Sequence, residues 1–445
     1  MSSRTAAVIM AGGLGTRMRS QLPKHLHPLL GKRLVDWVID ASRSLDPERL
    51  VVVTSPGSAE AYDGVEIAVQ ERPLGTGDAA ATAQKALDGF EGAILIVPGD
   101  APLVTAEILE EVVDAHAREQ ASVTLLSFTS PVPLPYGRVL RDANGEVVRI
   151  VEEKDATDEE RAIEELNASF YVFEADALWR ALEKLDADNA QGELYLTDAV
   201  EHVVSEGGRA VAHRSHADPR DLVGVNTRAE LAQAATALRD RINERHMLAG
   251  VTIVDPATAW IDESVELEAD STVHPFTVLR GQTRVAAGAE IGPHAVVDGA
   301  ELGPGALAGP FCYLRPGTVL AAGAKAGAFV EIKNTHVGER SKVPHLSYIG
   351  DAEIGEDSNI GAGAITANFP HPPDQPKQQT KIGKNVRTAV HNAFVAPVEI
   401  GDDSWTAAGS VITDDVPPGS LAGFPPRQIT KEGYVSERAK RDDGD

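Results

Sequence analysis

Apolar runs alternate with helical patterns along roughly the first 225 residues. Four runs rich in Val, Ile, Leu and Ala predict buried strands at residues 6–10, 50–54, 93–97 and 123–128. Apolar positions at helical spacing predict intervening helices at residues 34–44, 78–87 and 106–119. This alternation predicts an α/β domain with a doubly wound, mostly parallel, Rossmann-like sheet that helices cover on both faces. Ligands of such sheets bind at the carboxyl ends of the strands.

A single helix is predicted to follow this domain. Thr227 and Glu230 have the spacing of a capping box, in which each side chain accepts a hydrogen bond from a free backbone amide of the first turn. Gly250 can end the helix. Apolar residues recur between them at helical spacing, at Leu231, Ala234, Leu238 and Ile242.

Beyond residue 250 the apolar pattern changes to a period of six. The first series is Ile261, Leu267, Val273, Leu279, Val285, Ile291 and Val297. Later members are Val337, Val343, Ile349, Ile382, Phe394, Ile400 and Ile412. Neither the period of a helix nor that of a strand gives this spacing. It is typical of hexapeptide repeats, in which each repeat forms one flat face and its aliphatic residue points into a triangular core. We therefore expect a left-handed parallel β-helix.

These patterns divide the chain into four parts. They are an α/β domain at 1–226, a linker helix at 227–249, a β-helix at 250–430 and a polar tail at 431–445. Prolines at residues 370–376 interrupt the repeat and predict a projecting loop. Because prisms of this kind leave flat flanks that pack against copies of themselves, we expect a closed homotrimer.

Charge and cysteine content restrict the function. The net charge of −26, from 67 acidic and 41 basic residues, disfavours nucleic acid and anionic membranes as partners. We interpret the acidity as a solvated surface suited to high salt. The single cysteine, Cys312, excludes an internal disulfide framework and is expected to be a packing residue. With no membrane-spanning run and no signal-peptide core, the sequence predicts a cytoplasmic protein.

A glycine-rich turn follows the first predicted strand. Residues 11–17 read AGGLGTR, and successive amides of such a turn can bind an anion. The spacing fits neither the dinucleotide fingerprint nor the P-loop, and a purely structural turn is an alternative. Arg17 and Lys24 place two cations near the turn, which in so acidic a chain indicates a triphosphate site.

Two further motifs point to the same ligand. Asp100 follows the strand at residues 93–97 and is therefore expected at the carboxyl end of the sheet, where it can hold Mg²⁺. A turn-initiating Asp is the alternative interpretation. Gly75 and Thr76 lie in an LGTG loop at a helix start, which is typical of a base or ribose contact.

Taken together, these motifs resemble a bacterial family of bifunctional enzymes, the N-acetylglucosamine-1-phosphate uridylyltransferase and glucosamine-1-phosphate N-acetyltransferase family. The resemblance covers nearly the whole chain. The matching segments of the first domain are residues 11–18, 22–24, 74–77, 99–100, 136–138, 150–157, 167, 191–198 and 224–226.

The resemblance implies roles for individual residues of the α/β domain. Asp100 and Asn226 would hold Mg²⁺, and Arg17 and Lys24 would be catalytic cations that steady the phosphates. The sugar phosphate, N-acetylglucosamine 1-phosphate, would attack the α-phosphate of UTP and release pyrophosphate. Pro73 stands where the family has a uracil-contacting Gln, so uridine preference is left open. The implied nucleotide-sugar contacts are Ala11, Gly12, Gly13, Leu14, Lys24, Gly75, Thr76, Gly99, Asp100, Gly137, Glu152, Asn167 and Asn226.

A second group of polar residues lies within the repeat. His345 is followed closely by Tyr348, and a lone His at the rim of a β-helix is the alternative to a catalytic one. By the resemblance, His345 would be the general base that takes a proton from the amine of glucosamine 1-phosphate as it attacks acetyl-CoA. The implied substrate contacts are Arg315, Lys333, Tyr348, Asn359 and Lys377. The implied acetyl-CoA contacts are Ala362, Asn368, Phe369, Ala389, Ala408 and Arg427.

The second half departs from the family at three positions. Phe369 stands where a Tyr is usual, Ala389 replaces a Ser, and Pro425 occupies the position of a coenzyme-contacting Arg, with Arg427 close by. Three alternatives therefore stay open. The β-helix could serve only to trimerise or regulate a nucleotidylyltransferase, the protein could be a nucleotide-sensing assembly protein, or the acyl group or amino sugar could differ.

Overall fold

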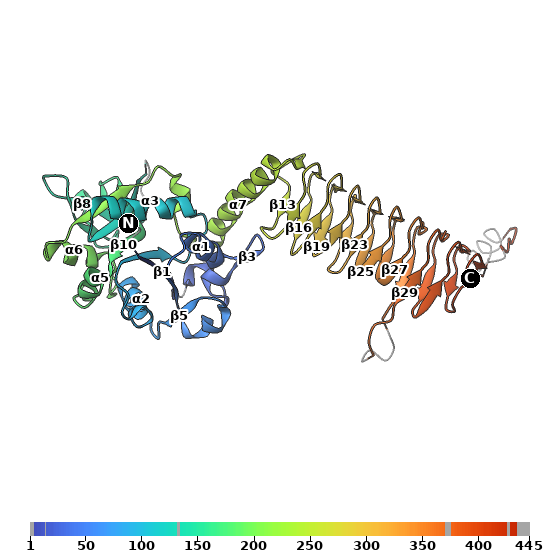
Figure 1. Cartoon of the computed structure of the whole chain (residues 1–445), viewed down its shortest axis with the longest axis horizontal. Coiled ribbons are helices and arrows are strands. Elements are labelled where there is room, and N and C mark those ends of the chain that lie inside the picture. Colours follow the sequence, from blue (N-terminus) through green and yellow to red (C-terminus); the bar gives the residue numbers. More distant parts are fainter. Residues whose placement is uncertain (1–3, 14, 131–133, 370–374, 425–427, 434–445) are drawn as a thin grey trace, which may run out of the picture. The chain divides into compact units, whose positions relative to one another are not determined.

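The computed structural model describes residues 4–13, 15–130, 134–369, 375–424 and 428–433 (Figure 1). The chain divides into two compact units, Met1–Leu238 and Arg239–Asp445. The division falls inside helix α7 (Arg228–Leu248). Within the described ranges, no helix combines the length and apolar character that a membrane crossing requires.

The first unit contains one mixed sheet with the strand order β11-β7-β10-β6-β1-β4-β5. Its strands are parallel except β10, which runs antiparallel to β6 and β7. A hairpin of β8 (Arg138–Arg141) and β9 (Val147–Val151) joins the sheet through β10. The strands of this order are β1 (Thr5–Ala11), β4 (Arg49–Thr54), β5 (Glu66–Val69), β6 (Ala93–Pro98), β7 (Val123–Thr129), β10 (Glu165–Glu174) and β11 (Ala210–Arg214).

Helices cover both faces of this sheet, as the alternation predicts. On one face α1 (Leu34–Arg43) and α3 (Ala106–Glu119) bury residues such as Val38 and Val112. On the other, α2 (Thr76–Thr82), the 3-10 helix η4 (Ala83–Leu87), α5 (Ala175–Leu182) and α6 (Asp198–Ser205) form a second apolar cluster. The helix predicted at 78–87 thus begins at Thr76 and changes to a 3-10 helix at Ala83. The smaller elements are η1 (Thr16–Met18), η2 (Lys24–Leu26), β2 (Pro28–Leu29), β3 (Lys32–Arg33), η3 (Pro56–Ala61), α4 (Asp158–Arg161) and η5 (Pro219–Leu222).

The predicted capping box starts helix α7. Glu230 N donates to Thr227 Oγ1 at 3.2 Å, and Thr227 N donates to Glu230 Oε2 at 2.9 Å. Asn226 N donates to the same carboxylate oxygen at 2.6 Å, so the cap also fixes the residue that precedes the helix. After α7 the backbone turns at Gly250, whose φ of 96° is in the left-handed region that favours glycine.

The second unit is a parallel β-helix with three faces. The first face has β12 (Thr252–Ile253), β15 (Thr272–Val273), β18 (Glu290–Ile291), β21 (Leu307–Ala308), β24 (Lys325–Ala328) and β26 (Lys342–His345). The second has β13 (Trp260–Ile261), β16 (Val278–Arg280), β19 (Val296–Asp298), β22 (Tyr313–Leu314), β25 (Glu331–Val337), β27 (Tyr348–Ile354), β28 (Ile365–Ala367), β30 (Ala393–Val395) and β33 (Val411–Ile412). The third has β14 (Glu266–Leu267), β17 (Arg284–Val285), β20 (Glu301–Leu302) and β23 (Val319–Leu320), and continues through β25, β27, β29 (Thr380–Ile382) and β31 (Val398–Ile400). The last coils add the pair β32 (Trp405–Thr406) and β34 (Leu421–Ala422).

The hexapeptide aliphatic residues form the core of this β-helix, as predicted. All of those predicted are buried except Leu267, which is half-buried on the first coil, where β14 pairs only with β17. Successive coils pair at an offset of 16 to 20 residues, except at one longer coil, where Ala352 pairs with Thr380 and Ile365 with Ala393, each 28 residues on. The loop predicted at 370–376 enters in this longer coil, and its residues 370–374 lie outside the described residues. Of the predicted tail, residues 434–445 also lie outside them.

Candidate active sites

The glycine-rich turn lies against two polar side chains of the α/β unit. A Cβ on Gly12 would lie 2.5 Å from Gln70 Oε1, and a Cβ on Gly15 would lie 2.5 Å from Lys24 Cβ. Gly15 also has a φ of 59°. Beside Gly13, by contrast, no other part of the described chain lies within 4 Å of an added Cβ. The turn therefore packs closely on Gln70 and Lys24 and is open at Gly13. The predicted contact Leu14 lies outside the described residues.

Four predicted residues of the phosphate and metal site meet at the carboxyl end of the sheet. Lys24 forms an ion pair with Asp100, and its Nζ lies 3.0 Å from Asn226 Oδ1. A guanidinium nitrogen of Arg17 donates to the same Asn226 oxygen at 2.8 Å. Gly99 N donates to Met10 O at 2.9 Å, which ties the start of this loop to β1. The fold thus gathers two cations and two oxygen ligands from four separate segments.

The donor set suits a hard divalent cation. Asp100 and Asn226 supply a carboxylate and an amide oxygen, and both already bind the positive charge of Lys24. A Cβ on Gly224 would lie 2.7–3.0 Å from the Asp100 carboxylate, so glycine is required there for the carboxylate to keep its position. Among the described residues no group of three His, Cys, Asp or Glu side chains could hold a metal. A cation held here therefore needs further oxygens from phosphate or water.

The LGTG loop is fixed by the segment that precedes α6. Gly75, with a φ of 125°, faces the Leu194 backbone so closely that any side chain would clash. Gly77 N donates to Leu194 O at 2.8 Å, and Leu196 N donates to Thr76 Oγ1 at 3.0 Å. The two family segments 74–77 and 191–198 are therefore in direct contact.

The three predicted sugar contacts lie where the β8–β9 hairpin pairs with β10: Gly137 directly precedes β8, Glu152 directly follows β9, and Asn167 is in β10. Asn167 N donates to Gly137 O at 2.8 Å, and a Cβ on Gly137 would lie 2.8 Å from Ile150 Cγ2. Asn167 is buried, and its Nδ2 donates to the Tyr171 hydroxyl at 2.6 Å. Burial raises the pKa of the Glu152 carboxyl, which accepts a hydrogen bond from Thr197 Oγ1 at 3.1 Å.

Gln70 is a polar residue that the sequence analysis missed. It follows β5 directly, is buried, and its N donates to Thr54 O at 2.9 Å. Its Nε2 donates to Asp78 Oδ2 at 2.8 Å and to Gly75 O at 3.3 Å. The signal in the sequence was a polar residue at the carboxyl end of a strand, the same signal that identified Asp100.

In the β-helix, His345 ends β26 on the first face and its side chain is exposed. It pairs in register with Ala328, and its carbonyl accepts a hydrogen bond from Ser347 Oγ at 2.7 Å. The bridges Lys342–Asn359, Asn359–Arg387 and Arg387–Trp405 continue this face. When this register is continued three residues further along each coil, two predicted acetyl-CoA contacts, Ala362 and Ala408, fall in the column of His345.

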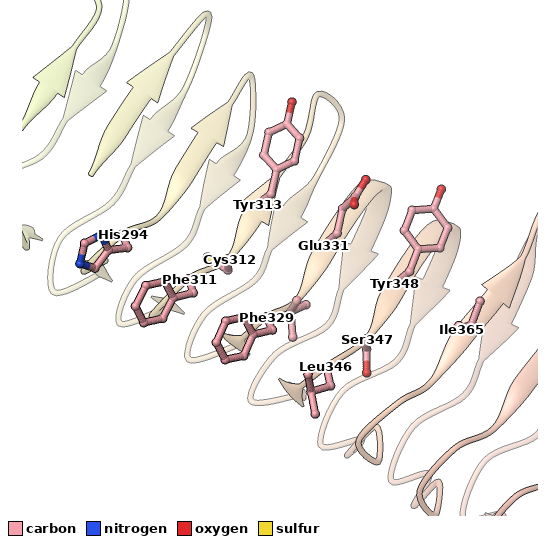
Figure 2. A pocket seen from close by; sticks show the side chains of 11 residues that line it. His294, Phe311, Cys312, Tyr313, Phe329, Glu331, Leu346, Ser347, Tyr348 and Ile365 are labelled. Carbon is pink, nitrogen blue, oxygen red and sulfur yellow. The ribbon is translucent and has the colours of Figure 1, made fainter. Parts of the chain in front are cut away.

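The predicted phosphate contacts gather at the second face: Lys333 is in β25, Tyr348 is in β27 and Arg315 directly follows β22, whereas Lys377 lies between β28 and β29. Tyr313, Glu331 and Tyr348 form one column there and are among the residues that line a pocket (Figure 2). Arg315 donates to Glu331 at 2.8 Å. The adjacent ammonium group of Lys377 lowers the pKa of Lys333, and Arg315 lowers it further. Three cations close together favour an anionic ligand.

The remaining predicted residues lie near the longer coil. Asn368 Nδ2 donates to Asp351, which also accepts from Asn334 Nδ2 at 2.7 Å. Phe369 is 60% exposed, and Ala389 N donates to Thr406 Oγ1 at 3.3 Å. Pro425 and Arg427 lie outside the described residues. Within one chain, His345 and the cations are thus on adjacent faces that meet at the corner formed by Leu346.

The chain is similar to known proteins along nearly its whole length. Residues 7–195 match the family of the MobA-like NTP transferase domain. The protein named "Bifunctional protein GlmU" from Streptomyces coelicolor is 44% identical, over 97% of this chain and 94% of the relative. Proteins of the same name from Corynebacterium efficiens and Mycobacterium tuberculosis are 43% and 44% identical, each over 98% of this chain and 94% and 92% of the relative.

Proposed function

The chain belongs to the family of bifunctional GlmU proteins, and we propose from this membership and from its two sites that it makes UDP-N-acetylglucosamine in two transferase reactions. It acetylates glucosamine 1-phosphate with acetyl-CoA, and it then transfers uridylyl from UTP to the N-acetylglucosamine 1-phosphate, releasing pyrophosphate. The product supplies cell-wall synthesis. Family membership over the full length favours this function over a nucleotidylyltransferase with a purely structural β-helix.

For uridylyl transfer, the α/β unit positions two phosphates for in-line attack. The glycine turn at Gly12 and Gly13 binds the triphosphate through its amides, and Arg17 and Lys24 neutralise the charge that develops on the α-phosphate. The sugar is held by Gly137, Glu152 and Asn167. A sugar phosphate oxygen forms the new bond to the α-phosphorus while the bond to pyrophosphate breaks, so the protein contributes positioning and charge rather than covalent chemistry.

Asp100 and Asn226 are the residues that we propose for Mg²⁺. What supports this is their shared contact with the Lys24 ammonium and the space that Gly224 leaves beside the carboxylate. Held there, Mg²⁺ would supply positive charge that offsets the negative charge of the phosphates. Lys24 would then be released from Asp100 to contact the nucleotide phosphates directly.

Gln70 is proposed as the contact to the base, which removes the difficulty raised by Pro73. Its amide lies between the turn at Gly12 and the loop at Gly75, and both loops belong to the proposed nucleotide site.

For acetyl transfer, His345 is proposed as the general base. Its imidazole takes a proton from the amine while the amine nitrogen attacks the thioester carbonyl and the coenzyme leaves as a free thiol. Arg315, Lys333 and Lys377 bind the sugar phosphate, with Tyr348 and Asn359 beside it. The coenzyme lies along Ala362, Ala389 and Ala408, with Asn368, Phe369 and Arg427 as further contacts.

A homotrimer is proposed because of the corner between the first two faces. The turn positions there are large and, except for one histidine, apolar, and they have φ values of 48–58°. These residues are Phe276, His294, Phe311, Phe329 and Leu346. At another corner, the residues with the same backbone conformation are Gly281, Gly299, Gly317, Asn334 and Asp351. Bulky residues in this region cost roughly 1 kcal/mol each relative to glycine.

The large side chains of this corner, hereafter the aromatic corner, are stacked and exposed. The ring centroid of His294 lies 4.7 Å from the ring centroids of Phe276 and Phe311. The ring centroid of Phe311 lies 5.3 Å from that of Phe329. Figure 2 shows the row from His294 to Leu346. Phe329 and Leu346 are 60% and 62% exposed. An exposed, strained apolar row supports an interface with further copies of the chain, which would cover it.

The reactions are proposed to occur in the cytoplasm, where UTP and acetyl-CoA are made. The small-molecule substrates fit the acidic composition because each phosphate site is built from local cations. Neither nucleic acid nor membrane is proposed as a partner.

The observation that carries the proposal is that one chain contains both sites. Lys24, Arg17, Asp100 and Asn226 contact one another in the α/β unit, and His345 lies in register with the neighbouring coil of the β-helix. The test measures thiol release from acetyl-CoA with glucosamine 1-phosphate, and pyrophosphate release from UTP with N-acetylglucosamine 1-phosphate, at low and molar salt. Both products are expected. If pyrophosphate but no thiol is released at both salt concentrations, the β-helix is only a structural part of a nucleotidylyltransferase.

A further inference from the structure

The side-chain amide of Gln70 has a fixed orientation in the α/β unit. Its nitrogen contacts two groups, the Asp78 carboxylate at 2.8 Å and the Gly75 carbonyl at 3.3 Å. A carbonyl and an ionised carboxylate can only accept hydrogen bonds. The amide end that faces them must therefore be the NH₂ group, because the carbonyl end would place three acceptors together.

This orientation leaves the amide with nothing to donate elsewhere. The NH₂ group has two hydrogens, and the two contacts use both. The other end, Oε1, lies against Gly12, where a Cβ would be only 2.5 Å away. Gln70 is 5% exposed and is fixed at its own backbone by Thr54, so the side chain has little freedom to move. Toward the nucleotide turn, Gln70 therefore presents an acceptor only.

A hydrogen-bond acceptor such as Gln70 Oε1, facing the base, distinguishes uracil from cytosine. Uracil has an N–H donor at N3, whereas cytosine has a lone pair there. Opposite a fixed carbonyl oxygen, uracil forms a hydrogen bond and cytosine places two acceptors face to face. A site that leaves a buried polar group unpaired with the wrong ligand discriminates strongly.

We infer that Asp78 is a specificity-determining positioning residue, which selects uracil over cytosine by holding the Gln70 amide with its oxygen toward the base. This inference rests on the proposed uridylyl transfer and on Gln70 as the base contact. Asp78 lies in the first turn of α2 and touches the base only through Gln70. Its role depends on the carboxylate being acceptor-only, which an amide of the same shape does not reproduce.

The experiment replaces Asp78 with residues that can also donate. In Asp78→Asn the new amide can either accept a hydrogen bond from Gln70 or donate one to it. The Gln70 amide can therefore also turn its nitrogen, rather than its oxygen, toward the base. The ratio of kcat/KM for UTP to that for CTP, measured by pyrophosphate release, is expected to fall about tenfold. Asp78→Ser, which introduces a hydroxyl that can both donate and accept in the first turn of the helix, is expected to lower the ratio similarly and guards against a folding defect in one variant.

Glu71→Gln is the matched control, because it removes the same charge one residue after Gln70 from an exposed position. Its UTP to CTP ratio is expected to equal that of the wild type. A ratio that stays within twofold of the wild type in both Asp78 variants overturns the inference, as does a wild type that uses CTP as well as UTP. If the wild type releases no pyrophosphate with any nucleotide, it is the proposed function that fails.

Discussion

Lys24 and Asp100 form an ion pair although 76 residues separate them in the sequence. Only 14% and 21% of their side-chain surfaces are exposed, so water screens the pair weakly. The lysine thus neutralises the carboxylate that we propose as a metal ligand. In the proposed reaction, a divalent cation would take the place of the Lys24 ammonium on Asp100, and Lys24 would then be available to the nucleotide phosphates.

Asp100→Asn is expected to remove uridylyl transfer selectively. The substitution keeps the shape of the side chain but removes the charge that holds the metal, and pyrophosphate release should fall about 10²–10³-fold. Thiol release from acetyl-CoA serves as the internal control and should be unchanged. If both activities disappear together, a folding defect is responsible and the metal assignment loses its support.

His345→Ala is expected to give the reverse result. Loss of the general base should lower thiol release about 10²–10⁴-fold while pyrophosphate release is unaffected. His336→Ala is the matched control, because His336 is an exposed histidine on β25 of the same β-helix. Undiminished acetylation in His345→Ala would show that another group takes the proton.

Glu152 predicts a pH dependence of stability. Burial raises the pKa of this carboxyl, so the folded chain binds its proton more tightly than the unfolded chain does. The stabilisation is fully present below the ordinary pKa of about 4.3 and is lost as the pH rises through the higher folded value. Glu152→Gln should therefore raise Tm at about pH 8 and leave it unchanged at about pH 4. An equal effect at both pH values contradicts the burial argument.

The aromatic corner predicts a charge-sensitive assembly. Phe329→Asp places a carboxylate among stacked apolar side chains and should convert trimers into monomers in sedimentation experiments at micromolar concentration. Val254→Asp adds the same charge at another site, since Val254 is 55% exposed on the first coil, and should leave the assembly intact. Trimers that survive Phe329→Asp would place the interface elsewhere.

The net charge of −26 predicts stabilisation by salt. Like charges on a folded surface repel one another, and salt screens that repulsion. The Tm is expected to rise steadily as potassium chloride is increased from about 0.1 M, where the Debye length is already about 10 Å, to 1 M. A flat or falling Tm would mean that the acidic residues are already compensated locally.

Periodicity explains how much of the fold could be predicted from the sequence. The six-residue spacing identified the inward residues because every coil repeats the same geometry, and only Leu267 on the first coil is less buried than predicted. The antiparallel direction of β10 could not be predicted, since an apolar run has the same composition in either direction. The position of Asp100 directly after a predicted strand was likewise enough to place it at the carboxyl end of the sheet.

The contacts of Gln70 could not be predicted from sequence. Its importance depends on the meeting of the Gly12 turn, the end of β5 and the start of α2, which no local pattern encodes. The same limit applies to the corner where His345 and the cations of the second face meet. Such sites are made by the packing of segments that are distant in the sequence.

The β-helix keeps its register although its coils differ in length. Ile365 pairs with Ala393, 28 residues on, and the coils that follow return to offsets of 16 or 18 residues. In genetic terms, the domain accepts insertions where two faces meet, since the added residues leave the later coils aligned. A single residue inserted within a face would instead turn its inward side chains to the outside. Gene variants of different length are therefore expected to differ at corners, and a corner is where a foreign peptide can be inserted.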